Sequence, residues 1–151
     1  MSFDIKINQN LENLLPHSGV MILVNEIIFV SESEIKTKSV IKDSPFLRNG
    51  KFYTYGLIEI MAQSLGLYKS YHDKTNSKDL AFLIGCRKFQ IFKPFLKIAD
   101  EVLAYAKLSM QDESGFGVYD CECSVGDLLI AKATISVFNP DKEKLVEIKN
   151  A

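Results

Sequence analysis

The chain has 151 residues, of which 47% are hydrophobic and 25% charged, and this composition fits one globular domain. Lys and Arg number 18 against 19 Asp and Glu, so the net charge is -1 and the basic excess typical of nucleic-acid-binding proteins is missing. The first residues, MSFDIKINQN, lack a secretory signal, and no apolar run approaches the ~20 residues that span a bilayer. We therefore expect a cytoplasmic protein with a single domain over residues 1–151.

In chain order, the first predicted element is a short helix over residues 10–16, begun by an asparagine cap and ended by proline. Two β-rich segments follow, VMILVNEIIFV at 20–30 and EIKTKSVIK at 34–42, with SESE between them as the turn. The stretch DSPFLRNGK, residues 43–51, contains Ser-Pro and Asn-Gly and is expected to be loop.

A long helix is predicted over about residues 54–72, where the sequence reads TYGLIEIMAQSLGLYKSYH. Apolar residues cover most of its circumference, so this helix has to be buried. Between Leu57 and Tyr68, Glu59 is the one ionisable residue relevant near neutral pH.

A polar connector leads from the helix to four strand-like segments at residues 80–92, 101–110, 116–125 and 128–138. In the last segment Leu129, Ala131, Ala133, Ile135 and Val137 share one face, with Lys132, Thr134 and Ser136 on the other. Gly126-Asp127 before it is a tight-hairpin signal, and the charged tail at 140–151 is expected to be loosely held.

This order of elements predicts an α+β domain. The simplest way to bury an apolar helix with these strands is to curl one antiparallel sheet around it. We therefore predict the hotdog fold, one curved antiparallel sheet wrapped around a long central helix.

Three cysteines, Cys86, Cys121 and Cys123, bear on redox state and metal binding. An odd number without a secretory signal argues against a disulfide framework. Because the chain has only His17 and His72 as imidazole ligands, we expect buried, reduced thiols and no metal site.

Glu59 and Gln63 lie four residues apart and stack on one face of the predicted helix. Partial burial disfavours the charged form of a carboxylate, which suits a group that donates a proton near neutral pH. A structural interpretation stands beside this one, because negative charge is also favourable near a helix start. Gln63 is interpreted as a residue that orients Glu59 or its neighbours.

The segment GLIEIMAQSLGLY resembles the central-helix signature of the 3-hydroxyacyl-[acyl carrier protein] dehydratases of the FabZ class. LPHSGVMILVNEIIFV resembles the first strand of that class, and AFLIGCRKFQIFKPFLKIADEVLAYAKL its next pair of strands, so that the resemblance covers residues 11–138. LLPHSGVMILVNEI, DSPF and GLIEIMAQ together are most similar to the ApeP-like branch, whose members sit in aryl-polyene and related fatty-acid-like pathways.

The resemblance implies a homodimer, heterodimer or higher oligomer of hotdog subunits with active sites at the interface. The substrate would be a 3-hydroxyacyl thioester on acyl carrier protein or coenzyme A, and the products a trans-2-enoyl thioester and water. Glu59 stands where the family has the carboxylate that protonates the leaving hydroxyl. No cofactor is implied, because β-elimination beside a thioester needs only an acid, a base and carbonyl polarisation.

The sequence departs from the FabZ class in the loop before the helix. That class has a histidine there as the base, whereas PFLRNGKFYTYG has none, and Thr54 replaces a family glycine whose nearest substitute is Gly56. His17 in LPHSG is the candidate base, with a role in anchoring the chain as the alternative. His72 is expected to be a solvated surface residue.

The predicted substrate-binding residues are Gln63, Gly56, Leu57 and Tyr55. Basic residues in CRKFQIFKPFLK are either a docking patch for an acidic carrier protein or ordinary solubilising charges. Two other functions remain open. One is a hotdog thioesterase, and the other is a catalytically silent subunit that binds acyl chains or supports an active partner.

Overall fold

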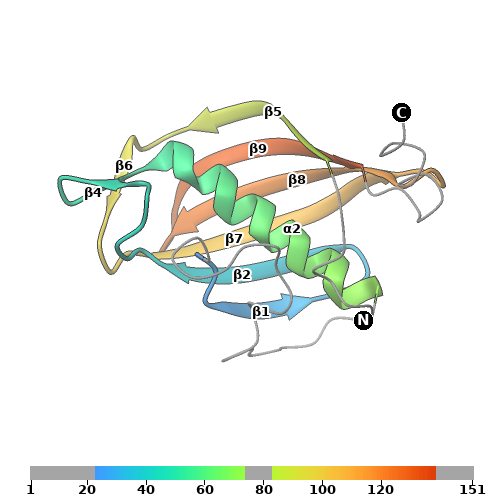
Figure 1. Ribbon diagram of the computed structural model, residues 1–151, viewed down its shortest axis with the longest axis horizontal. Helices are drawn as coiled ribbons and strands as arrows, with labels where there is room; N and C mark the ends of the chain where they lie inside the picture. Colours follow the sequence, from blue (N-terminus) through green and yellow to red (C-terminus); the bar gives the residue numbers. More distant parts are fainter. Residues whose placement is uncertain (1–22, 74–82, 139–151) are drawn as a thin grey trace.

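The structure, a computed structural model, describes residues 23–73 and 83–138. A six-stranded antiparallel sheet packs one face against a single long helix (Figure 1). The α+β class and the hotdog fold predicted from the sequence are confirmed. The short helix predicted at 10–16, His17 and the charged tail at 140–151 lie outside the described residues.

The six strands follow the spatial order β1-β2-β7-β8-β9-β5, so β1 and β5 form the edges of this sheet among the described strands. Their bounds are β1 Glu26–Val30, β2 Glu34–Val40, β5 Leu83–Ile91, β7 Glu101–Gln111, β8 Phe116–Val125 and β9 Leu128–Phe138. All neighbouring pairs are antiparallel. Each predicted strand segment therefore overlaps one of these strands.

The long helix, α2, spans Leu57–Asp73 and follows a short 3-10 helix, η2, at Thr54–Gly56. It lies across the inner face of the sheet and contacts β2, β7 and β8 (Figure 1). Its largest fully buried side chains are Leu57, Ile60, Met61, Leu65 and Leu67. Burial of each such side chain contributes about 1.5–3 kcal/mol, so the helix is held mainly by its apolar contacts with the sheet. Within the described residues, none of the helices has the length and apolar character needed to cross a membrane.

A second, three-stranded sheet forms beside the start of α2 (Figure 1). Its strands are β3 Leu47–Arg48, β4 Lys51–Tyr53 and β6 Phe95–Lys97. Asn49 and Gly50 between β3 and β4 have φ of 54° and 76°, as a two-residue type I′ hairpin requires. The prediction of loop over 43–51 was wrong in this part, because Asn-Gly here closes a hairpin.

The alternation predicted for β9 is confirmed over most of its length, with Ala131 and Ala133 buried and Lys132 between them exposed. It breaks near the start of the strand, where Ile130 is also fully buried. A register shift opposite Cys123 and Ser124 accounts for the break, because a β-bulge inserts one residue and changes the phase of the alternation.

The cysteines divide between the core and an edge. Cys121 and Cys123 on β8 are buried free thiols, as predicted, but Cys86 is exposed. The prediction of burial was wrong for Cys86, because it lies on the edge strand β5, which among the described strands of this sheet pairs only with β9.

Two hydroxyl residues on the inner face of β2 lead to a test of the interface between helix and sheet. Thr37 Oγ1 lies 2.8 Å from Ser64 Oγ on α2, whereas the buried Ser39 Oγ has no hydrogen-bond partner. We expect Thr37→Val to lower the free energy of unfolding by about 1 kcal/mol, and Ser39→Ala to leave it unchanged or raise it. Urea unfolding of the two variants measures this difference. A loss in Ser39→Ala as large as that in Thr37→Val would contradict it.

Candidate active site

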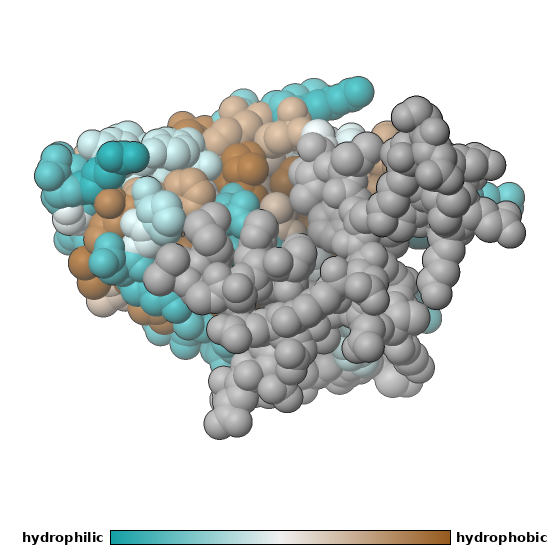
Figure 2. Space-filling view, in the orientation of Figure 1, coloured by the Kyte–Doolittle hydropathy of each residue, from teal (hydrophilic) through white to brown (hydrophobic). Residues whose placement is uncertain are grey.

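Glu59 is the third residue of α2 and lies in its first turn. Its side chain is half-buried, between the half-buried Ile58 and the fully buried Ile60. Hydrophobic residues are visible on this face of the molecule, interspersed with hydrophilic ones (Figure 2). The carboxylate therefore combines two features, an apolar neighbourhood and the favourable field of a helix N-terminus.

Gln63 joins Glu59 to the segment that enters β1. Its Nε2 donates a hydrogen bond to Glu59 Oε1 at 3.1 Å. Its Oε1 accepts hydrogen bonds from the backbone N–H groups of Leu23 at 2.8 Å and Val24 at 3.3 Å. The predicted stacking of Glu59 and Gln63 is confirmed, and the link to Leu23 and Val24 is a tertiary contact that helical spacing does not predict.

Gly56 is buried beneath two aromatic rings just before α2. A Cβ atom at this position would lie 2.8 Å from Phe46 Cγ and 2.9 Å from Phe52 Cζ. Tyr55 beside it is 50% exposed, and its ring meets that of Phe46 edge-on, with the centroids 6.1 Å apart. Glycine is required here because the two rings approach the backbone so closely that no side chain fits between them.

Thr54 fastens the start of the helix to the turn between β5 and β6. Its hydroxyl donates to the carbonyl oxygens of Lys93 at 2.7 Å and Pro94 at 2.9 Å, and its backbone N–H donates to the latter oxygen at 3.1 Å. Thr54 is 1% exposed. The residue that departs from the FabZ class is therefore a structural anchor here, which sequence comparison alone did not indicate.

The remaining predicted residues lie in different surroundings. Leu57 is fully buried, and its N–H donates to the carbonyl of Thr54, so its part in substrate binding stays a prediction. His72 is exposed at the far end of α2, where its Nε2 lies 2.7 Å from the carbonyl oxygen of Ser31. A rise of 1.5 Å per residue separates it from Glu59 by about 20 Å along the helix. The surface position predicted for His72 is confirmed.

Tyr68, one turn before His72, reinforces this end of the helix. Its hydroxyl donates to the carbonyl of Glu32, and its ring lies 4.4 Å from that of His72. Burial, with a smaller contribution from the negative charge of Glu32, raises the pKa of Tyr68. These contacts attach the far end of α2 to the turn between β1 and β2.

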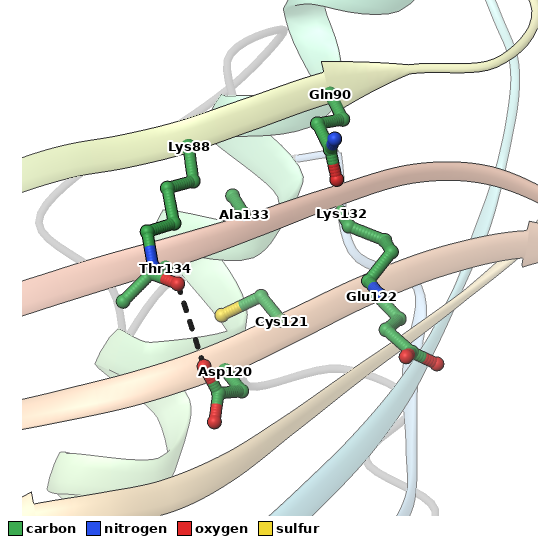
Figure 3. Close-up of a pocket in the computed structure, with 8 residues that line it drawn as sticks. All are labelled: Lys88, Gln90, Asp120, Cys121, Glu122, Lys132, Ala133 and Thr134. Carbon is green, nitrogen blue, oxygen red and sulfur yellow. Dashed lines mark hydrogen bonds between the residues drawn. The ribbon is translucent and has the colours of Figure 1, made fainter.

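A hollow of about 350 Å³ lies on the sheet face turned away from α2 (Figure 3). Its lining residues are Lys88, Gln90, Asp120, Cys121, Glu122, Lys132, Ala133 and Thr134. Lys88 adopts φ 54° within a β-bulge between Arg87 and Gln90, which brings its side chain onto this outer face. Positively and negatively charged side chains alternate across the hollow, as on a solvated face of a sheet. Because the hollow lies on the sheet face turned away from α2, it lies apart from Glu59. Within residues 23–73 and 83–138, no cluster of His, Cys, Asp or Glu is arranged to hold a metal ion.

Known proteins match most of the length of this chain. Residues 9–148 match the model of the ApeP-like family, described as ApeP dehydratase. The 3-hydroxyacyl-[acyl-carrier-protein] dehydratase FabZ of Streptococcus sanguinis is 28% identical over 134 residues, which are 84% of this chain and 93% of that protein. FabZ of Streptococcus gordonii is 29% identical over 133 residues, 83% of this chain and 92% of that protein.

Among solved structures, a chain of the dehydratase heterocomplex ApeI:P from Xenorhabdus doucetiae is 25% identical, with a TM-score of 0.80 over 93% of this chain and 97% of that one. A hypothetical thioesterase from Streptococcus pneumoniae, 17% identical, has a TM-score of 0.59 over 76% of this chain and 84% of that one, and shows the fold alone. The resemblance found in the sequence is confirmed. The chain belongs to the ApeP-like family of hotdog dehydratases.

Proposed function

We propose that this protein removes water from 3-hydroxyacyl thioesters carried by acyl carrier protein or coenzyme A, in a fatty-acid-like or aryl-polyene-type pathway. The observation that carries the proposal is the carboxylate of Glu59, a half-buried residue in the first turn of α2 that accepts a hydrogen bond from Gln63. Membership of the ApeP-like family and similarity to two proteins named FabZ support the reaction class.

The reaction needs a base at C2, the carbon beside the thioester carbonyl, and an acid at the hydroxyl group on C3, the next carbon. A base takes a proton from C2, and the electron pair of that C–H bond forms the new C2–C3 double bond. The C3–O bond breaks, and Glu59 gives its proton to the departing hydroxyl group, which leaves as water. We assign the base to His17, and we assign contacts with the acyl thioester to Tyr55, Gly56, Leu57 and Gln63.

A second hotdog subunit is proposed to cover the β5 edge. Within the described part of the six-stranded sheet, β5 pairs on one side only, and Ile91 and Phe92 at its end are 42% and 55% exposed. An open strand edge with exposed apolar residues is a pairing surface. The partner is a second copy or a related hotdog chain, and the similar Xenorhabdus chain comes from a heterocomplex.

Thiol labelling tests this interface through Cys86. Burial raises the pKa of the Cys121 thiol to about 12 and also raises that of Cys123, so neither forms the reactive thiolate in the native protein. We expect a maleimide to label only Cys86 before unfolding, and to label it more slowly as association covers β5. Mass spectrometry at several protein concentrations, with and without a hotdog partner, measures this rate, and Cys86→Ser is the control. If the labelling rate of Cys86 stays the same when the subunits associate, the result would argue against a β5 interface.

The proposed reaction is tested by mass spectrometry of a 3-hydroxyacyl carrier protein incubated with the wild type and with His17→Ala. Loss of one water with the wild type alone supports the dehydratase and His17 as its base. Loss with both proteins removes His17 from the mechanism. Release of a free acid would identify a thioesterase, and an unchanged substrate that reacts only after a hotdog partner is added would identify a supporting subunit.

A further inference from the structure

The side chain of Thr54 joins the turn after β5 to the start of α2. The strand ends at Ile91, and in the turn that follows the carbonyl oxygens of Lys93 and Pro94 accept the Thr54 hydroxyl at 2.7 and 2.9 Å. The backbone N–H of Thr54 donates to the Pro94 oxygen as well, at 3.1 Å. Because Thr54 is 1% exposed, these hydrogen bonds are shielded from competition by water.

A continuous series of contacts leads from Thr54 to the carboxylate. Thr54 is the first residue of η2, and its carbonyl oxygen accepts the N–H of Leu57, the first residue of α2. Glu59 follows two residues later, in the first turn of the helix. Hydrogen bonds and helical segments of this kind are the physical elements that carry a displacement from one site to another.

The Thr54 hydroxyl has two acceptors for one proton. A hydroxyl group carries a single O–H, so it donates fully to only one of the two carbonyl oxygens at a time. The Pro94 oxygen also accepts the N–H of Thr54, so the hydroxyl can turn to Lys93 without leaving the Pro94 oxygen bare. Two arrangements of similar length are thus available, and a small displacement of the turn is enough to favour one of them.

This turn comes directly after the exposed apolar end of β5. Ile91 and Phe92 are 42% and 55% exposed and belong to the surface that a second subunit is proposed to cover. The N–H of Phe92 donates to the carbonyl oxygen of Ile130 at 2.8 Å, and the next residue supplies the first carbonyl that Thr54 contacts. A subunit that packs on this end therefore acts on the turn to which Thr54 is attached.

We propose that Thr54 is a positioning residue that couples the end of β5 to Glu59. When a second copy of the chain packs against Ile91 and Phe92, the turn after β5 shifts, and Thr54 carries this shift into the first turn of α2. The carboxylate of Glu59 reaches its working position only in the associated protein. The inference rests on the proposed function, because it makes the subunit on β5 place the proposed acid.

Two substitutions at Thr54 separate positioning from support of the fold. Thr54→Val keeps the shape of the side chain and removes its hydroxyl, whereas Thr54→Ser keeps the hydroxyl. Thr134→Val is the control, because the Thr134 hydroxyl donates to Asp120 at 3.4 Å, beside the hollow on the outer face of the sheet. In the associated protein we expect Thr54→Val alone to lower kcat by about 10- to 100-fold, the scale on which a misplaced catalytic group loses rate.

A spectroscopic measurement follows the carboxylate independently of turnover. The ¹³C carboxyl signal of Glu59 is assigned by its loss in Glu59→Gln, and analytical ultracentrifugation at rising protein concentration gives the fraction of chains that are associated. In the wild type and in Thr54→Ser, the signal should shift in step with this fraction. In Thr54→Val the signal should stay at the position of the free chain although the subunits associate.

Three results would overturn the proposal. They are an equal shift of the Glu59 signal in Thr54→Val, a loss of kcat in Thr54→Ser as large as that in Thr54→Val, and a wild-type chain whose Glu59 signal or monomeric state never changes with concentration. If the shift depends on the Thr54 hydroxyl in a protein that releases no water from any 3-hydroxyacyl thioester, the coupling stands and the proposed dehydratase function fails.

Discussion

Glu59→Gln should lower kcat for dehydration by about 10²- to 10⁴-fold while the protein keeps its fold, because this is the range contributed by a positioned general acid. The substitution preserves the shape and length of the side chain and removes only its ability to give up a proton. Gln63 can still donate to the oxygen of the new amide, so the hydrogen bond that joins the two residues at 3.1 Å can persist.

This expectation is tested by measuring kcat, KM and the free energy of unfolding in urea on the same variant. Glu122→Gln is the matched control, because Glu122 is an exposed glutamate that lines the hollow on the outer face of the sheet. We expect the control to match the wild type in all three quantities. An active Glu59→Gln variant, with kcat within a few-fold of wild type, would remove Glu59 from the mechanism.

Gly56→Ala should lower the free energy of unfolding by about 1–3 kcal/mol, the usual cost of adding atoms to a well-packed site. The new methyl group would lie 2.8 Å from Phe46 Cγ and 3.0 Å from its Cβ, atoms close to the backbone that cannot swing aside. Either the β3–β4 hairpin or the start of α2 has to move. Because Glu59 is three residues further along, kcat should fall together with stability.

Urea unfolding and steady-state kinetics measure the two effects of Gly56→Ala. Gly85→Ala on β5 is the control, since a Cβ atom there meets no atom within 4 Å. That variant should unfold within about 0.5 kcal/mol of the wild type. If the two alanine variants are equally stable, the rings of Phe46 and Phe52 can move aside without lowering the free energy of unfolding.

Local patterns predicted much of this fold because they depend on residues that are close in the sequence. The apolar circumference of residues 57–68 predicted a buried helix, and α2 is that helix. Gly126-Asp127 predicted a tight turn, and Gly126 adopts φ 59° between β8 and β9. Glu59 and Gln63 were predicted to meet because helical geometry alone brings residues four apart together.

Other predictions failed where a local signal had two structural outcomes. Asn49-Gly50 is compatible with an irregular loop and with a hairpin, and pairing of β4 with β6, far along the chain, accompanies the hairpin. A cysteine in an apolar strand is usually buried, yet Cys86 is exposed because its strand is at the edge of the sheet.

The sequence by itself determined the fold class, the central helix, and the pair formed by Glu59 and Gln63. Only the tertiary structure decided what holds that pair and the helix start in place. The contacts of Gln63 with Leu23 and of Thr54 with Pro94 join residues 40 positions apart. No periodicity encodes such contacts, because they arise from how the whole sheet, with its bulges and register, packs against α2.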